Sequence, residues 1–118
     1  MKLFALRGAT TVEVNDRDAI LVATDELVNE IMQRNALHGG DVVSCIFTTT
    51  EDLDAEFPAL AARALGCPLL CAREIPVPGS MPRVIRVLMH YYAADDHEPV
   101  HVYLGEARAL RLDLNAAQ

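Results

Sequence analysis

One stretch of this sequence repeats apolar residues at the spacing of an α-helix, and strand-like stretches flank it on both sides. The apolar positions follow a period close to 3.6 residues, as in a helix that buries one face; they are Ile20, Leu21, Leu27, Val28, Ile31 and Met32. Asn15 or Asp16 would cap its first turn, and the pair Gly39-Gly40 is a usual stop signal. A single long helix beside several strands predicts an α+β domain, with the helix on one face of the sheet.

Five stretches are rich in β-forming residues and are predicted to be strands; they span residues 2–9, 41–50, 68–74, 84–92 and 100–104. A helix is the rival interpretation for residues 84–92, but their valines, isoleucine and tyrosines favour a strand. Residues 58–65 are predicted to be a short helix that begins at a proline and is closed by Gly66. Residues 75–82, with three prolines and a glycine, and the acidic residues 93–99 are predicted to be loops.

The predicted order is β-α-β-(short α)-β-β-β, which describes a single domain over residues 1–118 with a mixed sheet. A chain of this length buries only about two-thirds of its unfolded surface. The edges of the sheet also need covering, and subunit association would cover them. Residues 109–118 have no packing pattern of their own, so we expect a flexible C-terminal tail.

The charge of the chain indicates which kinds of partner it can bind, and its cysteine content indicates the cellular compartment. The formal net charge is −7, which argues against nucleic acid, because phosphate binding needs a basic surface. Nine of the ten basic residues are arginines, which suit bidentate recognition of carboxylates, so a few of them converging would bind an acidic ligand. No apolar run is long enough for a membrane span or a signal peptide. The odd set Cys45, Cys67 and Cys71 contains no CxxC pair, and we expect a cytoplasmic protein without disulfides.

Several segments, in order and at the right spacing, resemble the AroH class of chorismate mutases; they are Arg7-Gly-Ala-Thr-Thr, Phe57-Pro-Ala, Val84-Ile-Arg-Val-Leu-Met and His101-Val-Tyr-Leu with Ala109-Leu-Arg. The resemblance runs from Arg7 to about Leu114. It implies a homotrimer whose sheets surround a central pseudo-α/β-barrel, with three active sites at the subunit interfaces. It also implies the cofactor-free rearrangement of chorismate to prephenate, a step in phenylalanine and tyrosine biosynthesis, without a metal ion.

The resemblance assigns three residues to the reacting centre. Arg86 would lie beside the ether oxygen of chorismate, and Cys71 and Glu74 would contact the ring hydroxyl. Arg86 stands in the middle of an apolar strand, where an arginine is costly unless it is paired or functional. A structural salt bridge to an acidic residue at a subunit contact is the alternative role for Arg86. Since Cys71 and Glu74 are three positions apart, a regular strand would point them to opposite faces. Both side chains would reach one ligand only if the strand ends or bulges between them, and otherwise Cys71 would contribute through its backbone.

The remaining residues implied by the resemblance bind the substrate. Arg7, at the end of a strand, and Tyr103 would hold the side-chain carboxylate, and the resemblance counts Arg7 as catalytic together with Arg86 and Glu74. Phe57 would line the pocket from the neighbouring subunit, and Arg63 and Arg111 would lie near its mouth. The chain departs from the family at one position, because Leu60 stands where a relative carries a lysine after Phe57-Pro-Ala.

Other interpretations of the same residues were weighed. Three histidines, His90, His97 and His101, invite a metal site, but the neighbouring acidic run reads better as a hydrated loop, and we expect no metal. The chemistry would also suit an imine or enamine deaminase of the RidA type, which shares the trimeric fold and a carboxylate-binding strand arginine. A trimeric metabolite-binding module without enzymatic activity is the second alternative. The segment that begins at Arg7 favours the mutase.

Overall fold

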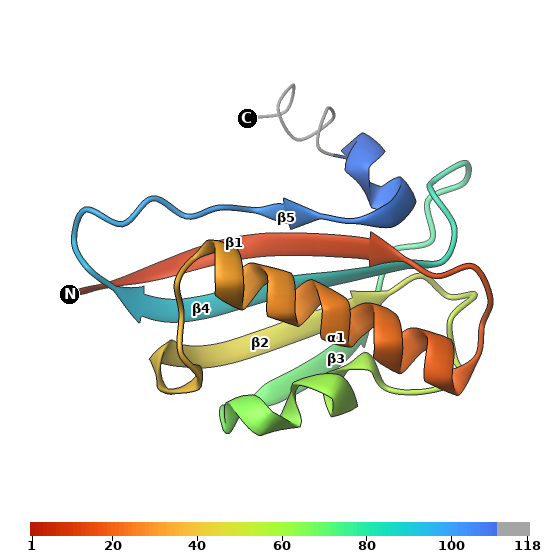
Figure 1. Ribbon diagram of the computed structural model, residues 1–118. Coiled ribbons are helices and arrows are strands. Elements are labelled where there is room, and N and C mark those ends of the chain that lie inside the picture. Colours follow the sequence, from red (N-terminus) through yellow and green to blue (C-terminus); the bar gives the residue numbers. More distant parts are fainter. Residues whose placement is uncertain (111–118) are drawn as a thin grey trace.

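Five strands form one mixed sheet in the order β3-β2-β4-β1-β5 in the computed structural model, which describes residues 1–110 (Figure 1). The strands are β1 Lys2–Thr11, β2 Val42–Thr49, β3 Leu69–Arg73, β4 Val84–Ala93 and β5 Val102–Tyr103. Strand β4 runs antiparallel to β1 and β2, whereas the β2–β3 and β1–β5 pairs are parallel. The predicted mixed sheet is therefore confirmed, and residues 84–92 are a strand rather than a helix.

The long helix α1 spans Arg17–Arg34 and begins where the sequence predicted. The Asp16 carboxylate Oδ2 accepts a hydrogen bond from the backbone N–H of Ala19 at 3.1 Å, which satisfies a free donor of the first turn. The helix ends before Gly39-Gly40, because the buried Asn35 amide donates to the carbonyl of Ile31 at 2.9 Å and to that of Val100 at 3.0 Å. Residues Gly39–Asp41 form a separate 3-10 turn, η1.

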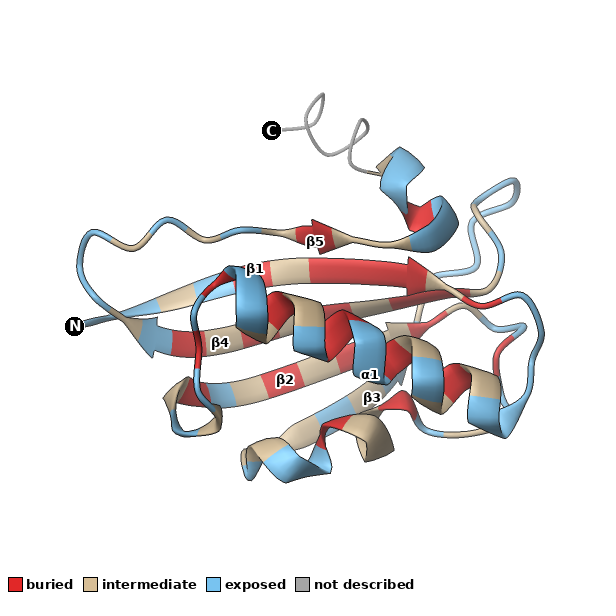
Figure 2. Cartoon of the chain, in the orientation of Figure 1, coloured by how far each residue is buried: buried red, intermediate tan, exposed pale blue. Residues whose placement is uncertain are grey.

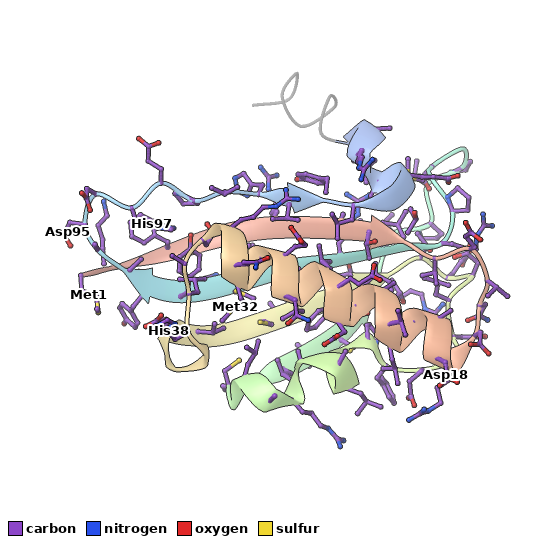
Figure 3. The ribbon with its side chains drawn as sticks, viewed as in Figure 1. Met1, Asp18, Met32, His38, Asp95 and His97 are labelled. Atoms are coloured by element: carbon purple, nitrogen blue, oxygen red, sulfur yellow. The ribbon has the colours of Figure 1, made fainter. Side chains whose placement is uncertain are left out.

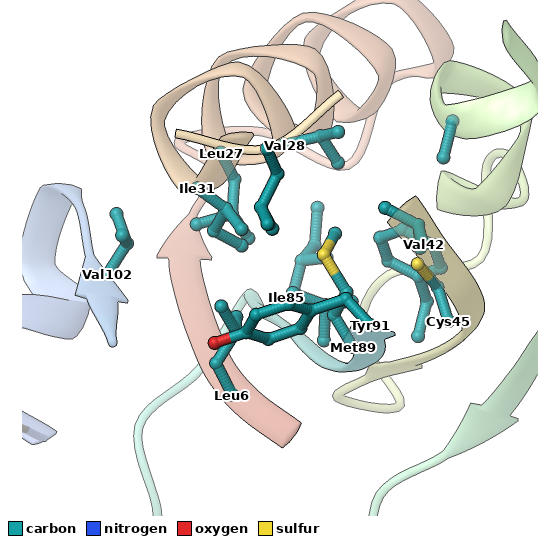
Figure 4. Close-up of a cluster of buried hydrophobic side chains, with 14 of the residues drawn as sticks. Leu6, Leu27, Val28, Ile31, Val42, Cys45, Ile85, Met89, Tyr91 and Val102 are labelled. Atoms are coloured by element: carbon teal, nitrogen blue, oxygen red, sulfur yellow. The ribbon is translucent and has the colours of Figure 1, made fainter. Parts of the chain in front are cut away.

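Helix α1 covers one face of the sheet, where it lies in front of the strands (Figure 1). Its fully buried Ile20, Leu27 and Ile31 pack against apolar side chains that alternate along the central strands (Figure 4). Gly8 in β1 allows this close approach, since a Cβ there would lie 2.8 Å from Cδ1 of Ile31. The second 3-10 helix, η2 (Pro58–Leu65), closes at Gly66 as predicted and covers the β2–β3 side of the same face.

The opposite face of the sheet, which we call the open face, carries the alternate residues of each strand, among them Arg7, Arg86, Leu3, Leu70 and Tyr92. Buried segments alternate along the strands with partly buried and exposed ones (Figure 2). Leu3, Leu70 and Tyr92 are 52%, 62% and 46% exposed, which is high for large apolar side chains in a sheet. Exposed apolar surface of this kind marks an interaction face.

The C-terminal part of the described chain differs from the sequence prediction. Strand β5 is only two residues long, because the backbone of Val100 bonds to the Asn35 side chain instead of to a neighbouring strand. After it comes a 3-10 helix that was not predicted, η3 (Gly105–Ala109), whose Ala107 is buried beside Ala9 and Val84. The expected flexible tail, residues 109–118, lies largely outside the described residues.

Candidate active site

Arg86 and Glu74 meet on the open face as an ion pair. The Arg86 Nε donates to the carboxylate of Glu74 at 3.0 Å, and the hydroxyl of Thr48 donates to Oε2 of the same carboxylate at 3.0 Å. Arg86 lies near the start of β4 and Thr48 near the end of β2, and the two residues are partners in the sheet register. The partner of Arg86 is therefore another residue predicted for the reacting centre, Glu74 of the same chain.

This pair contributes little to stability, which leaves function as the better reason for its position. The side chains of Arg86 and Glu74 are 42% and 17% exposed, and a partly solvated ion pair gains little net free energy. The contact engages Nε of Arg86, whereas the two Nη groups carry four further N–H donors that a ligand can use. A fixed guanidinium with further N–H donors can stabilise a negative charge that develops on a bound substrate.

Glu74 is the first residue after the end of β3. The backbone N–H of Glu74 still bonds to the carbonyl of Thr49 at 2.9 Å, so the chain keeps its direction past Arg73. Three positions earlier, Cys71 packs against the core on the helix-covered face. The side chains of Cys71 and Glu74 therefore lie on opposite faces, as the two-residue period predicted, and only the backbone of Cys71 can share a ligand with Glu74.

Two hollows adjoin these residues. The larger, of about 740 Å³, is lined by Thr48, Glu74, Arg86 and the loop of residues 75–82. The smaller, of about 420 Å³, is lined by Phe57 and Cys71 among others. Arg73 lies in the wall of both hollows, so they adjoin at the end of β3.

Arg7 and Tyr103 continue the row of open-face residues toward β5. Ala9 pairs with Arg86 on one side and with Tyr103 on the other, so Tyr103 lies two strands away from Arg86 in the same row. Arg7 occupies the next open-face position of β1, beside Leu88. Pairing register thus places four predicted site residues, Arg7, Glu74, Arg86 and Tyr103, on one face.

Residues predicted for the rest of the site do not join this group within one chain. Phe57 precedes η2 and is 66% exposed beside the smaller hollow. Arg63 is exposed on η2, which covers the other face of the sheet, and Leu60 lies in the same helix. Arg111 falls outside the described residues. The candidate residues therefore divide into an open-face group and a group around η2.

The three histidines do not gather in one place. Nε2 of His97 lies 2.7 Å from the hydroxyl of Tyr91, at the end of the sheet where Met1 and Asp95 also meet (Figure 3). His90 contacts Ser44, and Nδ1 of His101 accepts a hydrogen bond from the backbone N–H of Arg7 at 2.9 Å. Within residues 1–110 no three His, Cys, Asp or Glu side chains are grouped to hold a metal ion, and no helix is long and apolar enough to span a membrane.

The cysteines are free thiols, as expected. Burial, together with the neighbouring Cys67, raises the pKa of the Cys45 thiol to about 12. Cys45 therefore stays protonated near neutrality and cannot act as a thiolate nucleophile. Cys45 lies in the hydrophobic core, and Cys67 and Cys71 pack against it, as small apolar side chains do.

Two residues in or beside the site were missed by sequence reasoning, Thr48 and His101. Thr48 lies in a run of three threonines, in which no local pattern singles out one residue. Its position is evident only from the β2–β4 register, which pairs it with Arg86. His101 belongs to the segment that carries the family resemblance, but the only role weighed for its side chain was that of a metal ligand. It lies two residues before Tyr103, on the same alternating face.

An open sheet face that carries two arginines, a carboxylate and a tyrosine has the chemistry to bind a small anionic molecule. Comparison with known proteins agrees. The model of the family described as chorismate mutase type I matches residues 3–114. A chorismate mutase AroH from Thermus thermophilus is 49% identical, with 96% of this chain and 97% of that protein covered, and one from Bacillus subtilis (strain 168) is 37% identical, with 98% and 94% covered. A solved chorismate mutase from Clostridium thermocellum superposes with a TM-score of 0.85 at 46% identity, over 90% of this chain and 98% of that one.

The chain therefore belongs to the type I chorismate mutase family, in its AroH class. Its activity is that of a chorismate mutase, an isomerase. The resemblance identified from the sequence is confirmed, and so is the preference for a mutase over a RidA-type deaminase or a binding module without activity.

Proposed function

We propose that chorismate binds on the open face beside the Arg86–Glu74 pair and rearranges there to prephenate without a cofactor. The rearrangement breaks one C–O bond while one C–C bond forms, and no proton has to be transferred. A protein accelerates such a reaction by holding the folded conformer and by stabilising the shifted charge. The observation that carries this proposal is the fixed guanidinium of Arg86, which stands in an apolar strand and borders a hollow of about 740 Å³.

Arg86 and Glu74 take complementary roles in this proposal. Negative charge grows on the ether oxygen as the C–O bond stretches, and the Nη groups of Arg86 are the donors that would meet it. Positive charge spreads over the ring, and the Glu74 carboxylate offsets it while accepting a hydrogen bond from the ring hydroxyl. The backbone of Cys71 would supply the second contact to that hydroxyl, since its side chain lies on the other face.

The two carboxylates of chorismate call for cations around this centre. Arg7 and Tyr103 would hold the side-chain carboxylate. Tyr103 lies in the same open-face row as Arg86 and Arg7 in the next row, which supports this role. Arg63 and Arg111 would lie near the mouth of the pocket. Leu60 offers no charge where a relative has a lysine. The positive charge near the mouth of the pocket would therefore come from Arg63 and Arg111.

We further propose that the site is shared between subunits of a homotrimer, in which the open faces surround a central pseudo-barrel. The exposed Leu3, Leu70 and Tyr92 of the open face support burial by another copy. Phe57 precedes η2 and Arg63 lies in it, away from the open face, so they would reach a substrate only on a neighbouring subunit. Sedimentation equilibrium should give a trimer, and a stable monomer at micromolar concentration would contradict the shared site.

The biological setting follows from the reaction. Prephenate leads to phenylalanine and tyrosine, so we assign the enzyme to the biosynthesis of these amino acids. The three free thiols support a location in the reducing cytoplasm.

Substitution of Arg86 tests the proposed centre. Loss of one well-placed donor typically lowers kcat about 10²–10³-fold, and we expect at least that loss for Arg86→Ala. Arg86→Lys should recover little of it, because a lysine cannot reproduce the fork of donors. The rate of chorismate loss is followed by absorbance, and Arg34→Ala, which breaks an exposed ion pair on α1, is the control expected to keep its activity.

A purely structural salt bridge would give the opposite pattern. Arg86→Ala would then lower the melting temperature and keep more than about a tenth of the wild-type kcat, and Arg86→Lys would restore stability. Paired measurements of kcat and melting temperature on the three variants separate these outcomes.

A further inference from the structure

The short strand β5 carries Tyr103 beside β1, yet it pairs with β1 at only two positions, Gly8↔Val102 and Ala9↔Tyr103. The next donor along β1 is the backbone N–H of Arg7. It donates to Nδ1 of His101 at 2.9 Å, a partner 94 residues away in sequence. A side chain thus accepts the hydrogen bond that a strand carbonyl would otherwise accept.

The structure around His101 explains why no carbonyl takes this place. On one side, both the N–H and the carbonyl of Val100 bond to the Asn35 side chain at the end of α1. On the other side, the N–H of Leu104 bonds to the carbonyl of Ala9 at 2.9 Å. The segment is therefore held at both ends, and His101 is its contact with the backbone of Arg7.

We propose that His101 is a positioning residue for the rearrangement, which fixes the backbone of Arg7 against β5 so that Arg7 and Tyr103 meet the same substrate carboxylate. This inference rests on the proposed function, in which those two residues bind that carboxylate. His101 needs no contact with the substrate for this role. Its Nδ1 must be free of a proton to accept the bond.

The surroundings of His101 favour the form that this role requires. Burial lowers the pKa of His101, and the positive charge of Arg7 lowers it further. The imidazole is therefore neutral at neutral pH, with Nδ1 as the acceptor and the proton on Nε2. Arg7 is the charged group of β1 that faces the ring.

Two substitutions of similar size separate the hydrogen bond from the bulk of the side chain. In His101→Asn, Oδ1 is attached to Cγ as Nδ1 is, so the acceptor is kept. In His101→Leu, a methyl group takes that place and the acceptor is lost. We expect His101→Leu to raise KM for chorismate roughly tenfold or more with kcat changed less than about threefold, because a contact to an unreacting carboxylate binds ground and transition states alike. His101→Asn should keep KM within about threefold of wild type.

Three results would overturn this role. The first is an unchanged KM in His101→Leu. The second is a His101→Asn variant as impaired as His101→Leu. The third is a collapse of kcat together with kcat/KM in His101→Leu, which would make His101 a catalytic residue. Arg7→Ala, measured in parallel, tests the proposed site itself. If KM of Arg7→Ala is unchanged, the proposed site is wrong. If KM is raised in Arg7→Ala but normal in His101→Leu, only the positioning role is refuted.

A measurement on the wild-type protein keeps the test valid if His101→Leu does not fold. The backbone amide proton of Arg7 should shift in NMR spectra as pH falls, with the same midpoint as the His101 ring protons. An Arg7 amide shift that does not follow the ring titration would refute the hydrogen bond on which the inference depends.

Discussion

Gly8 lies where α1 approaches the sheet, and replacing it tests how closely the two layers pack. A Cβ at Gly8 would lie 2.8 Å from Cδ1 of Ile31 and 3.2 Å from both Cδ1 of Leu27 and Cγ1 of Val87. These atoms are ends of side chains, but their residues are at most 2% exposed, so they have little room to move. Overpacking of this kind costs about 1–3 kcal/mol.

The expected loss translates into a measurable shift in melting temperature. Globular proteins unfold with about 2.1 cal/mol/K per residue, so a chain of 118 residues has an unfolding entropy of about 0.25 kcal/mol/K. Gly8→Ala should therefore lower the melting temperature by about 4–12 °C. Thermal denaturation is followed by circular dichroism at one protein concentration, because association also affects the midpoint.

Gly40→Ala is the matched control, since a Cβ there would meet nothing within 4 Å. It should leave the melting temperature unchanged or raise it slightly, because alanine restricts the unfolded chain. An unchanged melting temperature in Gly8→Ala, or equal losses in both variants, would show that α1 does not pack on β1 as closely as described.

Three further predictions concern the site. The kcat should stay nearly constant from about pH 6 to 9, because no group transfers a proton, and a fall in kcat near neutrality would contradict this. The KM should rise only at lower pH, because the pKa of His101 is lowered and its Nδ1 stays an acceptor until the pH falls through that pKa. Truncation after Leu110 should raise KM more than it lowers kcat, because it removes Arg111 but keeps η3. A collapsed kcat at unchanged KM would show that residues 111–118 have another role. Thr48→Val should lower kcat about tenfold by freeing the Glu74 carboxylate, whereas Thr48→Ser should not, and equal rates in both would exclude a role for the hydroxyl.

Local sequence patterns were sufficient to predict most of the fold. The helix period and the cap at Asp16 gave the start of α1, and Pro58 with Gly66 gave both ends of η2. The two-residue period separated the side chains of Cys71 and Glu74. These features depend on neighbours within a few residues, which a sequence displays directly.

Features that depend on distant partners were not predicted. Asn35 ends α1 early and shortens β5 through its bonds to Val100, which is 65 residues away. Burial of Ala107 against Ala9 and Val84 forms η3, although the local sequence shows no helical period. Thr48 and His101 reach the site residues only because strand pairing brings them there. The resemblance to a family identified the other site residues, which alternation alone would not have joined.

The most direct test of the central claim is a crystal structure of the enzyme with its product, prephenate. We expect prephenate on the open face, with Nη groups of Arg86 and the carboxylate of Glu74 in contact with it and with Phe57 of a second subunit closing the pocket. Prephenate bound away from Arg86, or bound entirely within one chain, would contradict the proposed site and its position between subunits.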